Sequence, residues 1–332
     1  MRAKFLVICA AGVLLAASFL ARPPRKAYAA GPIPVDCNRA CLENLATEYL
    51  HALVAHNPAS LPLAKDVRYT ENDQLMSVGD GFWGTASSIG HFRVCFSDVV
   101  MEQIGCMVTM HEADHLLIMG MRLRVQLGRI TEVETSYYRQ GGGGPSGIAA
   151  LDASTPDPIW TETVPESERV SRASMIATAN KYFANLENDT GKGDLSFFAD
   201  DCNRMENGMQ TTNNPTPSPK AEFNAFALGC KAQFASGYYA VVTRIWQRRF
   251  PIVDQERGVV WANVTFDQNG TVHTIHLNNG KTVTMPGLFN RPSSIQVTEA
   301  FKVQNGQIHR IIMVGSGLPY HLHSPWGGIS DK

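Results

Sequence analysis

The chain has 332 residues, of which 44% are hydrophobic and 18% charged, and its formal net charge is −1 at pH 7. This length allows two domains at about 100–200 residues each, and the hydrophobic share excludes a wholly disordered chain. Of the 29 basic and 30 acidic residues, five basic and no acidic ones lie in positions 1–29, which leaves 24 against 30, or about −6, for the rest. An acidic body argues against a nucleic-acid partner, because nucleic acids bind to basic surfaces.

The first 29 residues have the pattern of a secretory signal peptide. Two basic residues precede an apolar run from Phe5 to Leu20, which at about 16 residues is shorter than the ~20 that span a bilayer. A small-x-small tripeptide ends at Ala29, as expected for cleavage before Ala30. We therefore expect a secreted protein, extracellular or periplasmic if the source is bacterial, without a stable membrane span after cleavage. An uncleaved anchor is the alternative.

Six cysteines remain after this segment, and an even number in an exported chain indicates disulfide bonds. One pairing is available within the second half. In the first half we expect partners that are close in sequence, although four cysteines allow three arrangements. The expected bonds are Cys37–Cys41, Cys95–Cys106 and Cys202–Cys230.

Three Asn-x-Thr sequons are candidate glycosylation sites if the source is a eukaryote. They begin at Asn188, Asn263 and Asn269. Each would then be expected on the surface.

The chain divides near its middle, and both halves follow the same order. A segment rich in glycine and proline, 141–167, is predicted to link a first domain at 37–140 to a second at 168–326. Each half has apolar residues at helical spacing, then a short polar element, and then strands joined by a glycine turn. In chain order these segments are 37–58, 67–73 and 121–138 in the first half, and 172–189, 202–208 and 299–315 in the second. The sequence thus predicts an α+β repeat.

This order resembles the nuclear-transport-factor-2-like superfamily, which includes SnoaL-like polyketide cyclases, scytalone dehydratase and ketosteroid isomerase. The similarity is closer still to tandem secreted members, many of them fungal and of unknown function. It implies two cone-shaped domains, each a strongly curved antiparallel sheet capped by helices around a conical pocket. It also implies that the two domains pack on each other, replacing the homodimer of the superfamily, so that a monomer is expected. The segments that resemble the family are "ALVAHNPASLPLAKDVRYTEN", "VGDGFWGTA", "LRVQLGRITEVET", "RMENG", "RRFPIVDQERGVV" and "PYHLHSPW".

The polar element that follows the first helix of each half is the best candidate for an active site. If extended, Tyr69 and Glu71 share one face, and so do Arg204 and Glu206. In the family fold this element contributes to the pocket mouth, where a partly desolvated carboxylate has a raised pKa suited to proton transfer. Glu71 or Glu206 is the expected base. Tyr69 and Arg204 are the expected proton donor or anion stabiliser, beside an apolar wall that includes Trp83. The alternative is an Arg–Glu ion pair that only joins helix to sheet.

The segment from His111 to His115 matches H-E-x-x-H, in which two histidines on one face of a helix bind zinc and Glu112 is the general base. The alternation of apolar residues after Leu116 favours a β-hairpin instead. In a strand, side chains four residues apart are separated by about 13 Å, too far to bind one ion. We therefore expect a hairpin bend and no metal.

Glu132 and Glu134 share one face of a predicted strand, about 7 Å apart. They are candidates for a third zinc ligand or an acid–base pair. We favour two solvated carboxylates, because Glu is seldom buried.

His321 and His323 point the same way if the segment "HLHSPW" is extended. With Tyr320 they are candidates for ligand binding, for acid–base chemistry or for part of a metal site. The alternative is a C-terminal tail held in place by Trp326.

The leading hypothesis is a cofactor-independent enzyme that transfers protons in a small, largely apolar organic molecule, by elimination, isomerisation or cyclisation. The alternatives are a non-catalytic secreted small-molecule-binding protein and a zinc hydrolase that uses the HEADH segment. We expect the main site in the second domain, around Arg204, Glu206 and the "PYHLH" segment. Longer inserts, at 211–220 and 278–293, lie in that half, and loops over a pocket usually set specificity.

Overall fold

The computed structural model describes residues 37–140, 147–214, 216 and 223–327. The predicted signal peptide lies outside these residues. Within them, no helix is long and apolar enough to span a bilayer.

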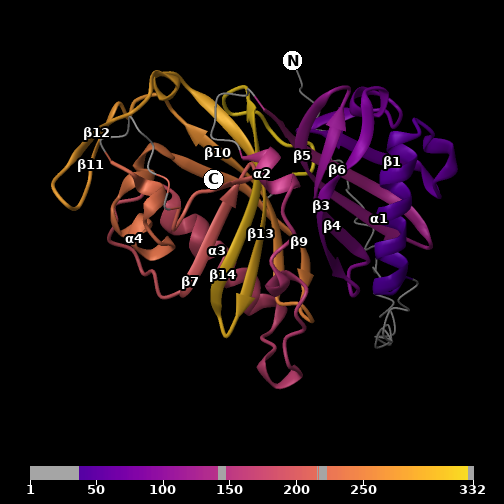
Figure 1. Ribbon diagram of the computed structural model, residues 1–332, viewed down its shortest axis with the longest axis horizontal. Coiled ribbons are helices and arrows are strands. Elements are labelled where there is room, and N and C mark those ends of the chain that lie inside the picture. Colours follow the sequence, from indigo (N-terminus) through magenta and orange to yellow (C-terminus); the bar gives the residue numbers. More distant parts are fainter. Residues whose placement is uncertain (1–36, 141–146, 215, 217–222, 328–332) are drawn as a thin grey trace, which may run out of the picture. The chain divides into compact units, whose positions relative to one another are not determined.

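The first half is one helix packed on a six-stranded sheet (Figure 1). Helix α1 (Arg39–Val54) begins after Asn38, whose side chain accepts a hydrogen bond from the backbone amide of Cys41. The strand order is β2-β1-β6-β5-β4-β3. Neighbouring strands are antiparallel except for β1 and β6. The strands are β1 (Leu63–Glu71), β2 (Gln74–Met76), β3 (Ala86–Asp98), β4 (Gln103–Glu112), β5 (His115–Gln126) and β6 (Arg129–Arg139).

The second half repeats this plan with the order β8-β7-β14-β13-β10-β9. Helix α3 (Arg172–Leu186) covers the sheet as α1 does, and it begins after Ser171, whose side chain accepts from the amide of Ser174. Helix α4 (Cys230–Ala235) and the hairpin of β11 (Thr274–His276) and β12 (Thr282–Thr284) have no counterpart in the first half. The other strands are β7 (Phe198–Glu206), β8 (Met209–Gln210), β9 (Arg244–Asp254), β10 (Val259–Gln268), β13 (Ser293–Gln304) and β14 (Gln307–Leu318).

These two helix-covered sheets confirm the predicted α+β fold class, with one correction. Each sheet is mixed rather than purely antiparallel, because the first strand of each half pairs with the last strand of that half, which runs in the same direction. The predicted limits of the two domains stay a prediction.

Two equivalent asparagines show how the two halves align with each other. Asn72 follows β1 and Asn207 follows β7, and both adopt the left-handed conformation, with φ of 45° and 49°, which asparagine tolerates better than most residues. The Asn72 amide donates to the Thr135 carbonyl (2.9 Å), and the Asn207 amide donates to the Met313 carbonyl (3.0 Å). The two sheets can therefore be compared residue by residue.

The two sheets pack on each other through the faces that point away from their helices. Phe96, Met107 and Ile118 of the first sheet and Trp261 and Ile312 of the second belong to one buried cluster. The segment predicted as a linker is part of this cluster, because helix α2 (Ile148–Asp152) and the short helix Pro158–Trp160 bury their apolar side chains there. Its apolar residues are few but anchor it between the sheets.

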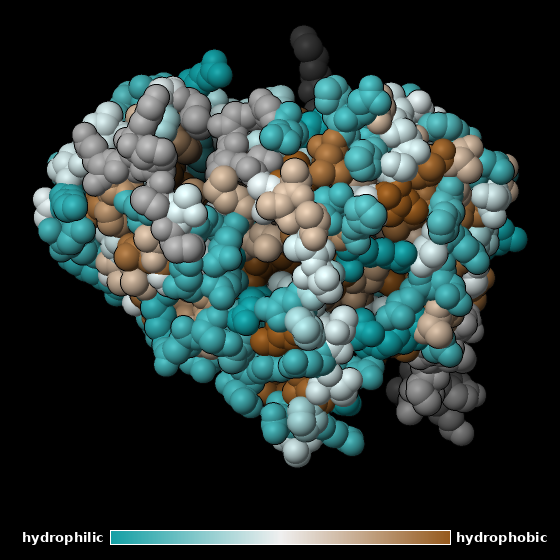
Figure 2. Space-filling view, in the orientation of Figure 1, coloured by the Kyte–Doolittle hydropathy of each residue, from teal (hydrophilic) through white to brown (hydrophobic). Residues whose placement is uncertain are grey.

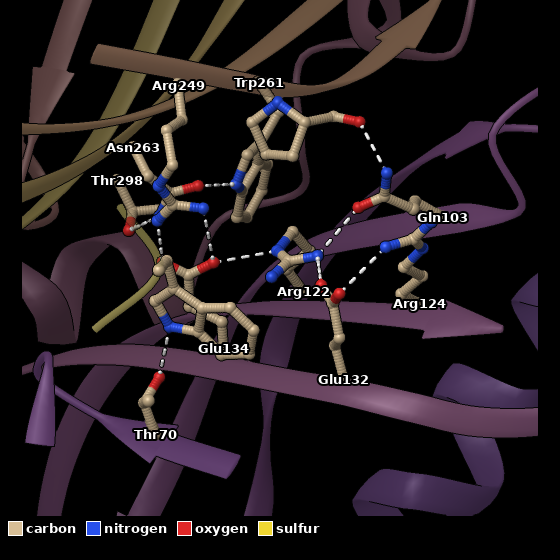
Figure 3. A network of polar contacts seen from close by, with 12 residues as sticks. Thr70, Gln103, Arg122, Arg124, Glu132, Glu134, Arg249, Trp261, Asn263 and Thr298 are labelled. Atoms are coloured by element: carbon tan, nitrogen blue, oxygen red, sulfur yellow. Dashed lines mark hydrogen bonds and ion pairs between the residues drawn. The ribbon is translucent and has the colours of Figure 1, made fainter. Parts of the chain in front are cut away.

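A charged network crosses the same contact (Figure 3). Glu134 of β6, 1% exposed, accepts hydrogen bonds from Arg122 of β5 (2.8 Å) and from Arg249 of β9 in the other sheet (3.2 Å). Glu132 accepts from Arg122 and Arg124. The prediction of a solvated carboxylate is therefore wrong for Glu134, whose burial is made possible by arginines from a neighbouring strand and from the distant second half. The Glu132 side chain stays 22% exposed, in ion pairs with two arginines.

The C-terminal segment after β14 crosses from the second sheet to the first. The Trp326 ring lies 4.5 Å from the guanidinium carbon of Arg68 and 4.8 Å from that of Arg122, and its Nε1 donates to Thr70 (2.8 Å). Ser324 donates to the buried Asp73 (2.8 Å). The anchoring by Trp326 that was given as the alternative is thus present.

All three expected disulfide bonds form: Cys37–Cys41, Cys95–Cys106 and Cys202–Cys230. The third joins β7 to α4 across 28 residues of sequence. Such bonds persist in oxidising compartments, so they fit an exported protein.

Glu134→Gln should lower the free energy of unfolding by about 3–5 kcal/mol, because it leaves the buried Arg122 and the partly buried Arg249 without their shared carboxylate. The measurement is urea unfolding followed by tryptophan fluorescence. Glu256→Gln is the matched control: the Glu256 side chain is 47% exposed in its ion pair with Arg39, and its loss should cost less than about 1 kcal/mol. Equal, small costs for both variants would contradict a stabilising role for the network.

Candidate active site

Glu71 lies in the interior of the first half, between α1 and the sheet, and its carboxylate is saturated with donors. Oε1 accepts from the Phe82 amide (2.7 Å) and the Tyr69 hydroxyl, and Oε2 accepts from the Tyr137 hydroxyl. Burial raises the pKa of both tyrosines, so they stay protonated. Glu71 is only 4% exposed. This arrangement suits a structural acceptor better than a base.

Trp83 also lies in the first interior, where it meets Tyr49 edge to face with 5.4 Å between ring centres. It is 1% exposed and belongs to the apolar core there, so its predicted role as a wall of a binding pocket stays a prediction. That wall belongs to the first half and not to the half that contains Arg204.

Arg204 occupies the corresponding interior of the second half. Its Nη1 donates to Gln233 (2.6 Å) and to the Tyr239 hydroxyl, and its Nη2 donates to Glu206. Its guanidinium carbon lies 5.0 Å from the ring centre of Tyr239 and 5.4 Å from that of Tyr182. Burial opposes its charge, but Glu206 outweighs this, and the pKa of Arg204 lies well above its usual value. Arg204 is a fixed positive charge inside an aromatic core.

Glu206 lies nearer to the solvent than its partner Arg204. Its side chain is 17% exposed, against 3% for that of Arg204. The ion pair that the sequence analysis gave as the structural alternative is therefore present, and it does not exclude a chemical role for the same pair.

Glu299 on β13 is the functional candidate that sequence reasoning missed. It is 1% exposed, and neither of its carboxyl oxygens forms a hydrogen bond of good geometry with the described residues. The Tyr182 hydroxyl acts on it as a hydrogen-bond donor and lowers its pKa, but by less than burial raises it. Burial raises the pKa of Glu299 to about 8, because the stabilisation from Arg204 is smaller than the cost of desolvation. At neutral pH this side chain is a protonated, buried carboxylic acid.

The Nε of Arg204 is also buried without an acceptor among the described residues. Buried polar groups are nearly always hydrogen-bonded, so an unpartnered donor and an unpartnered acid in one interior need an explanation. A bound molecule with an acceptor oxygen would satisfy both.

The shared register shows how the two interiors differ. In the first sheet, Thr135 of β6 pairs with Glu71 of β1 on one side and with Met121 of β5 on the other. In the second sheet, Met313 of β14 pairs in the same way with Glu206 of β7 and Glu299 of β13. The first interior therefore has Tyr69, Glu71 and Met121 where the second has Arg204, Glu206 and Glu299. The sequence contained this signal, because aligning "VQLG" (125–128) with "VQNG" (303–306) places Glu299 opposite Met121.

The HEADH segment is a hairpin, as predicted, and the zinc-hydrolase alternative that needed a helix is wrong. Glu112 at the end of β4 pairs with His115 at the start of β5. Glu112 accepts hydrogen bonds from Arg139 and Thr85, which fixes it at the tip of the sheet.

The histidines of the C-terminal segment lie away from Arg204. His321 stacks on Trp246 with 4.2 Å between ring centres, and its Nδ1 lies 2.9 Å from the buried Asp267. His323 packs edge to face on the same tryptophan, and Tyr320 is 46% exposed. Asp267 alternates with Phe266 on β10, whose side chain is in the inner core, so Asp267 faces the opposite side. The expected single site of Arg204, Glu206 and "PYHLH" is therefore divided by the sheet.

The three sequons differ in exposure. Asn188 is exposed and Asn269 is partly exposed. Asn263 is 3% exposed, accepts from Trp261 and donates to Thr298. A glycan at Asn263 is incompatible with this packing, so that sequon is corrected to a structural asparagine.

Comparison with known proteins gives a family match for the second half and a likeness in fold. Residues 168–315 match a family described as a domain of unknown function (DUF8021), and no curated protein matches the chain. Among similar solved structures is a nuclear-transport-factor-2-like protein of unknown function from Cytophaga hutchinsonii (13% identity, 29% of this chain and 89% of that chain, TM-score 0.25). Another is a steroid delta-isomerase from Pseudomonas aeruginosa (12%, 36% and 90%, TM-score 0.25). A third is a ketosteroid isomerase-like protein from Catenulispora acidiphila solved with trimethylamine (16%, 32% and 91%, TM-score 0.23).

Glu299→Met, which copies Met121, should stabilise the fold, and more so as the pH rises. The folded state keeps a proton on Glu299 up to pH about 8, whereas the unfolded chain loses it near pH 4.3. The wild-type free energy of unfolding therefore carries a penalty that grows by up to about 1.4 kcal/mol per pH unit between these values. Urea unfolding at pH 5 and pH 8 measures it.

Glu206→Met is the matched control with the opposite expected sign, because it removes the partner of buried Arg204. If Glu299→Met destabilises the chain at pH 8 as Glu206→Met does, the assignment of Glu299 as an unpartnered buried acid is wrong.

Proposed function

We propose that this chain is a secreted, cofactor-independent enzyme that transfers protons in a small, largely apolar carbonyl compound bound in the interior of the second half. The observation that supports this most is a pair of buried groups in an aromatic core, the Glu299 carboxyl and Arg204 Nε, which form no hydrogen bond of good geometry with the described residues. A carboxyl with a pKa near 8 is close to the operating pH that general acid catalysis requires.

In this proposal the three charged residues have different roles. Glu206, the most exposed of the three, is the base that removes a proton from the carbon beside the carbonyl. Arg204 Nε and the protonated Glu299 donate hydrogen bonds to the carbonyl oxygen as it becomes an enolate. Return of the proton from Glu206 to a different carbon completes an isomerisation. Transfer of the Glu299 proton to a leaving hydroxyl completes an elimination and releases water.

The second half is favoured over the first because of the state of its carboxyl groups. Glu71 already accepts three hydrogen bonds from the protein, and Met121 stands where Glu299 does. A substrate in the first interior would therefore meet no free acid at these positions.

The test is exchange of the α-protons of 2-tetralone for deuterium in D2O, followed by proton NMR. We expect wild type to exceed the buffer rate, and Glu206→Gln and Glu299→Gln each to reduce the enzymatic rate by about 100-fold. The wild-type rate should fall as the pH rises through 8, where Glu299 loses its proton, and Glu299→Gln should abolish that dependence.

Glu71→Gln is the control and should retain exchange provided that circular dichroism shows it folded. Loss of exchange in Glu71→Gln with retention in the other two variants would contradict the assignment. If 2-tetralone binds, by saturation-transfer NMR, without exchange above buffer, the chain is a binding protein and not an enzyme for such ketones.

A further inference from the structure

A separate cavity lies on the face of the second sheet opposite to the one that holds the Arg204 guanidinium. Its volume is about 290 Å3, near the lower end of the range for small-molecule sites. One wall is formed by Asn203 and Met205 of β7 and by Arg310 of β14, and the other by Asp157 and Trp160 of the segment that joins the two halves. Figure 2 shows hydrophobic atoms recessed near the middle of this face, where Figure 1 places β7, β14 and the joining segment.

Alternation along β7 separates this cavity from the proposed active site. The Arg204 side chain contacts Gln233, Tyr239 and Glu206 on the inner face. Asn203 and Met205, its neighbours, therefore project to the outer face. Arg204 itself is also among the residues that line the cavity, so strand β7 forms the boundary between the two sites, which lie on its opposite faces.

Three residues that line this cavity each have a side-chain nitrogen to which the described residues supply no acceptor. Arg310 uses Nε on Asp157 and Nη1 on Asp201 and on the backbone, and Asn203 uses its oxygen to accept from Asn213. No hydrogen bond among the described residues uses Arg310 Nη2, Asn203 Nδ2 or the indole Nε1 of Trp160. These donors favour a ligand with acceptor oxygens.

The charge around the cavity determines which acceptor is suitable. Arg310 is paired with two carboxylates, Asp157 (2.7 Å) and Asp201 (3.3 Å), so its positive charge is already balanced. A ligand carboxylate would face the surplus negative charge, whereas a neutral carbonyl would not. Phe92 and Trp160 supply an aromatic wall for a flat ligand.

From these contacts we infer that the cavity between β7, β14 and the joining segment binds a neutral, planar aromatic carbonyl compound, such as a lactone or ketone. Trp160 and Phe92 contact its ring, and Arg310 Nη2 and Asn203 Nδ2 donate to its oxygen. This ligand site is independent of the proton-transfer site on the inner face.

The test is titration of the full-length chain with coumarin, a neutral aromatic lactone, by isothermal calorimetry. We expect one coumarin per chain, and at least fivefold weaker binding for Asn203→Leu, which removes one donor. Naphthalene has the same two-ring shape without an acceptor, and its affinity should be unaffected by Asn203→Leu. 2-Naphthoate, which is anionic, should bind more weakly than coumarin.

Two tryptophan substitutions in the joining segment locate the site. Thr155 lines the cavity and is exposed, so Thr155→Trp should fill the cavity and abolish coumarin binding without disturbing the core. Thr161→Trp is the matched control, because Thr161 is exposed in the same segment but does not line the cavity. Failure of coumarin to bind, equal binding to both tryptophan variants, or tighter binding of 2-naphthoate would overturn the inference.

Discussion

Glu134 is buried where the two sheets meet, and it accepts hydrogen bonds from an arginine of each sheet, Arg122 and Arg249. Burial alone would raise the pKa of Glu134, but the charges of these two arginines outweigh it and lower the pKa below its usual value. An ionised carboxylate at this depth is tolerable only while both arginines stay in place. The relative position of the sheets is therefore restricted by charge pairing as well as by the apolar cluster around Trp261. The close approach also depends on Gly105, where a Cβ atom would lie 2.7 Å from the Trp261 ring.

The faces of the two sheets that point away from the helices are buried against each other. The two halves therefore differ mainly in the residues on their inner faces, between each sheet and its helix. Both halves have the same strand order and a left-handed asparagine after the polar strand. Each residue of one interior therefore has an equivalent position in the other. In the first interior, the Glu71 carboxylate accepts hydrogen bonds from three residues of the protein. In the second interior, neither the Glu299 carboxyl nor Arg204 Nε forms a hydrogen bond of good geometry with any residue that the structure describes. Unsatisfied buried groups lower stability, and they persist in proteins mainly where function needs them.

The joining segment and the C-terminal segment also hold the two sheets together. The joining segment seals the apolar cluster with Trp160 and at the same time forms one wall of a cavity. The C-terminal segment places Trp326 against arginines of the first sheet and His321 against Trp246 of the second. Both segments connect the halves through side chains, which makes the pairing of the sheets depend on residues outside any strand.

The sequence by itself determined the features that rest on local patterns: both helices, the polar strands and the HEADH hairpin. It indicated the three disulfide bonds, although it left three arrangements open for the four cysteines of the first half. These follow from spacing along the chain, because the residues concerned are close in sequence or repeat with the period of a helix or strand. It also indicated Arg204 and Glu206 as neighbours, since they share one strand face. Only the tertiary structure decided the environment of each charge. Glu132 and Glu134 have the pattern of surface residues, and Arg249, which makes the burial of Glu134 possible, lies 115 residues away. Glu299 acquires its raised pKa because a helix and a second strand remove it from water, and Glu71 is saturated because Tyr137 reaches it from another strand. Desolvation and pairing across the fold depend on distances between segments that no local pattern contains.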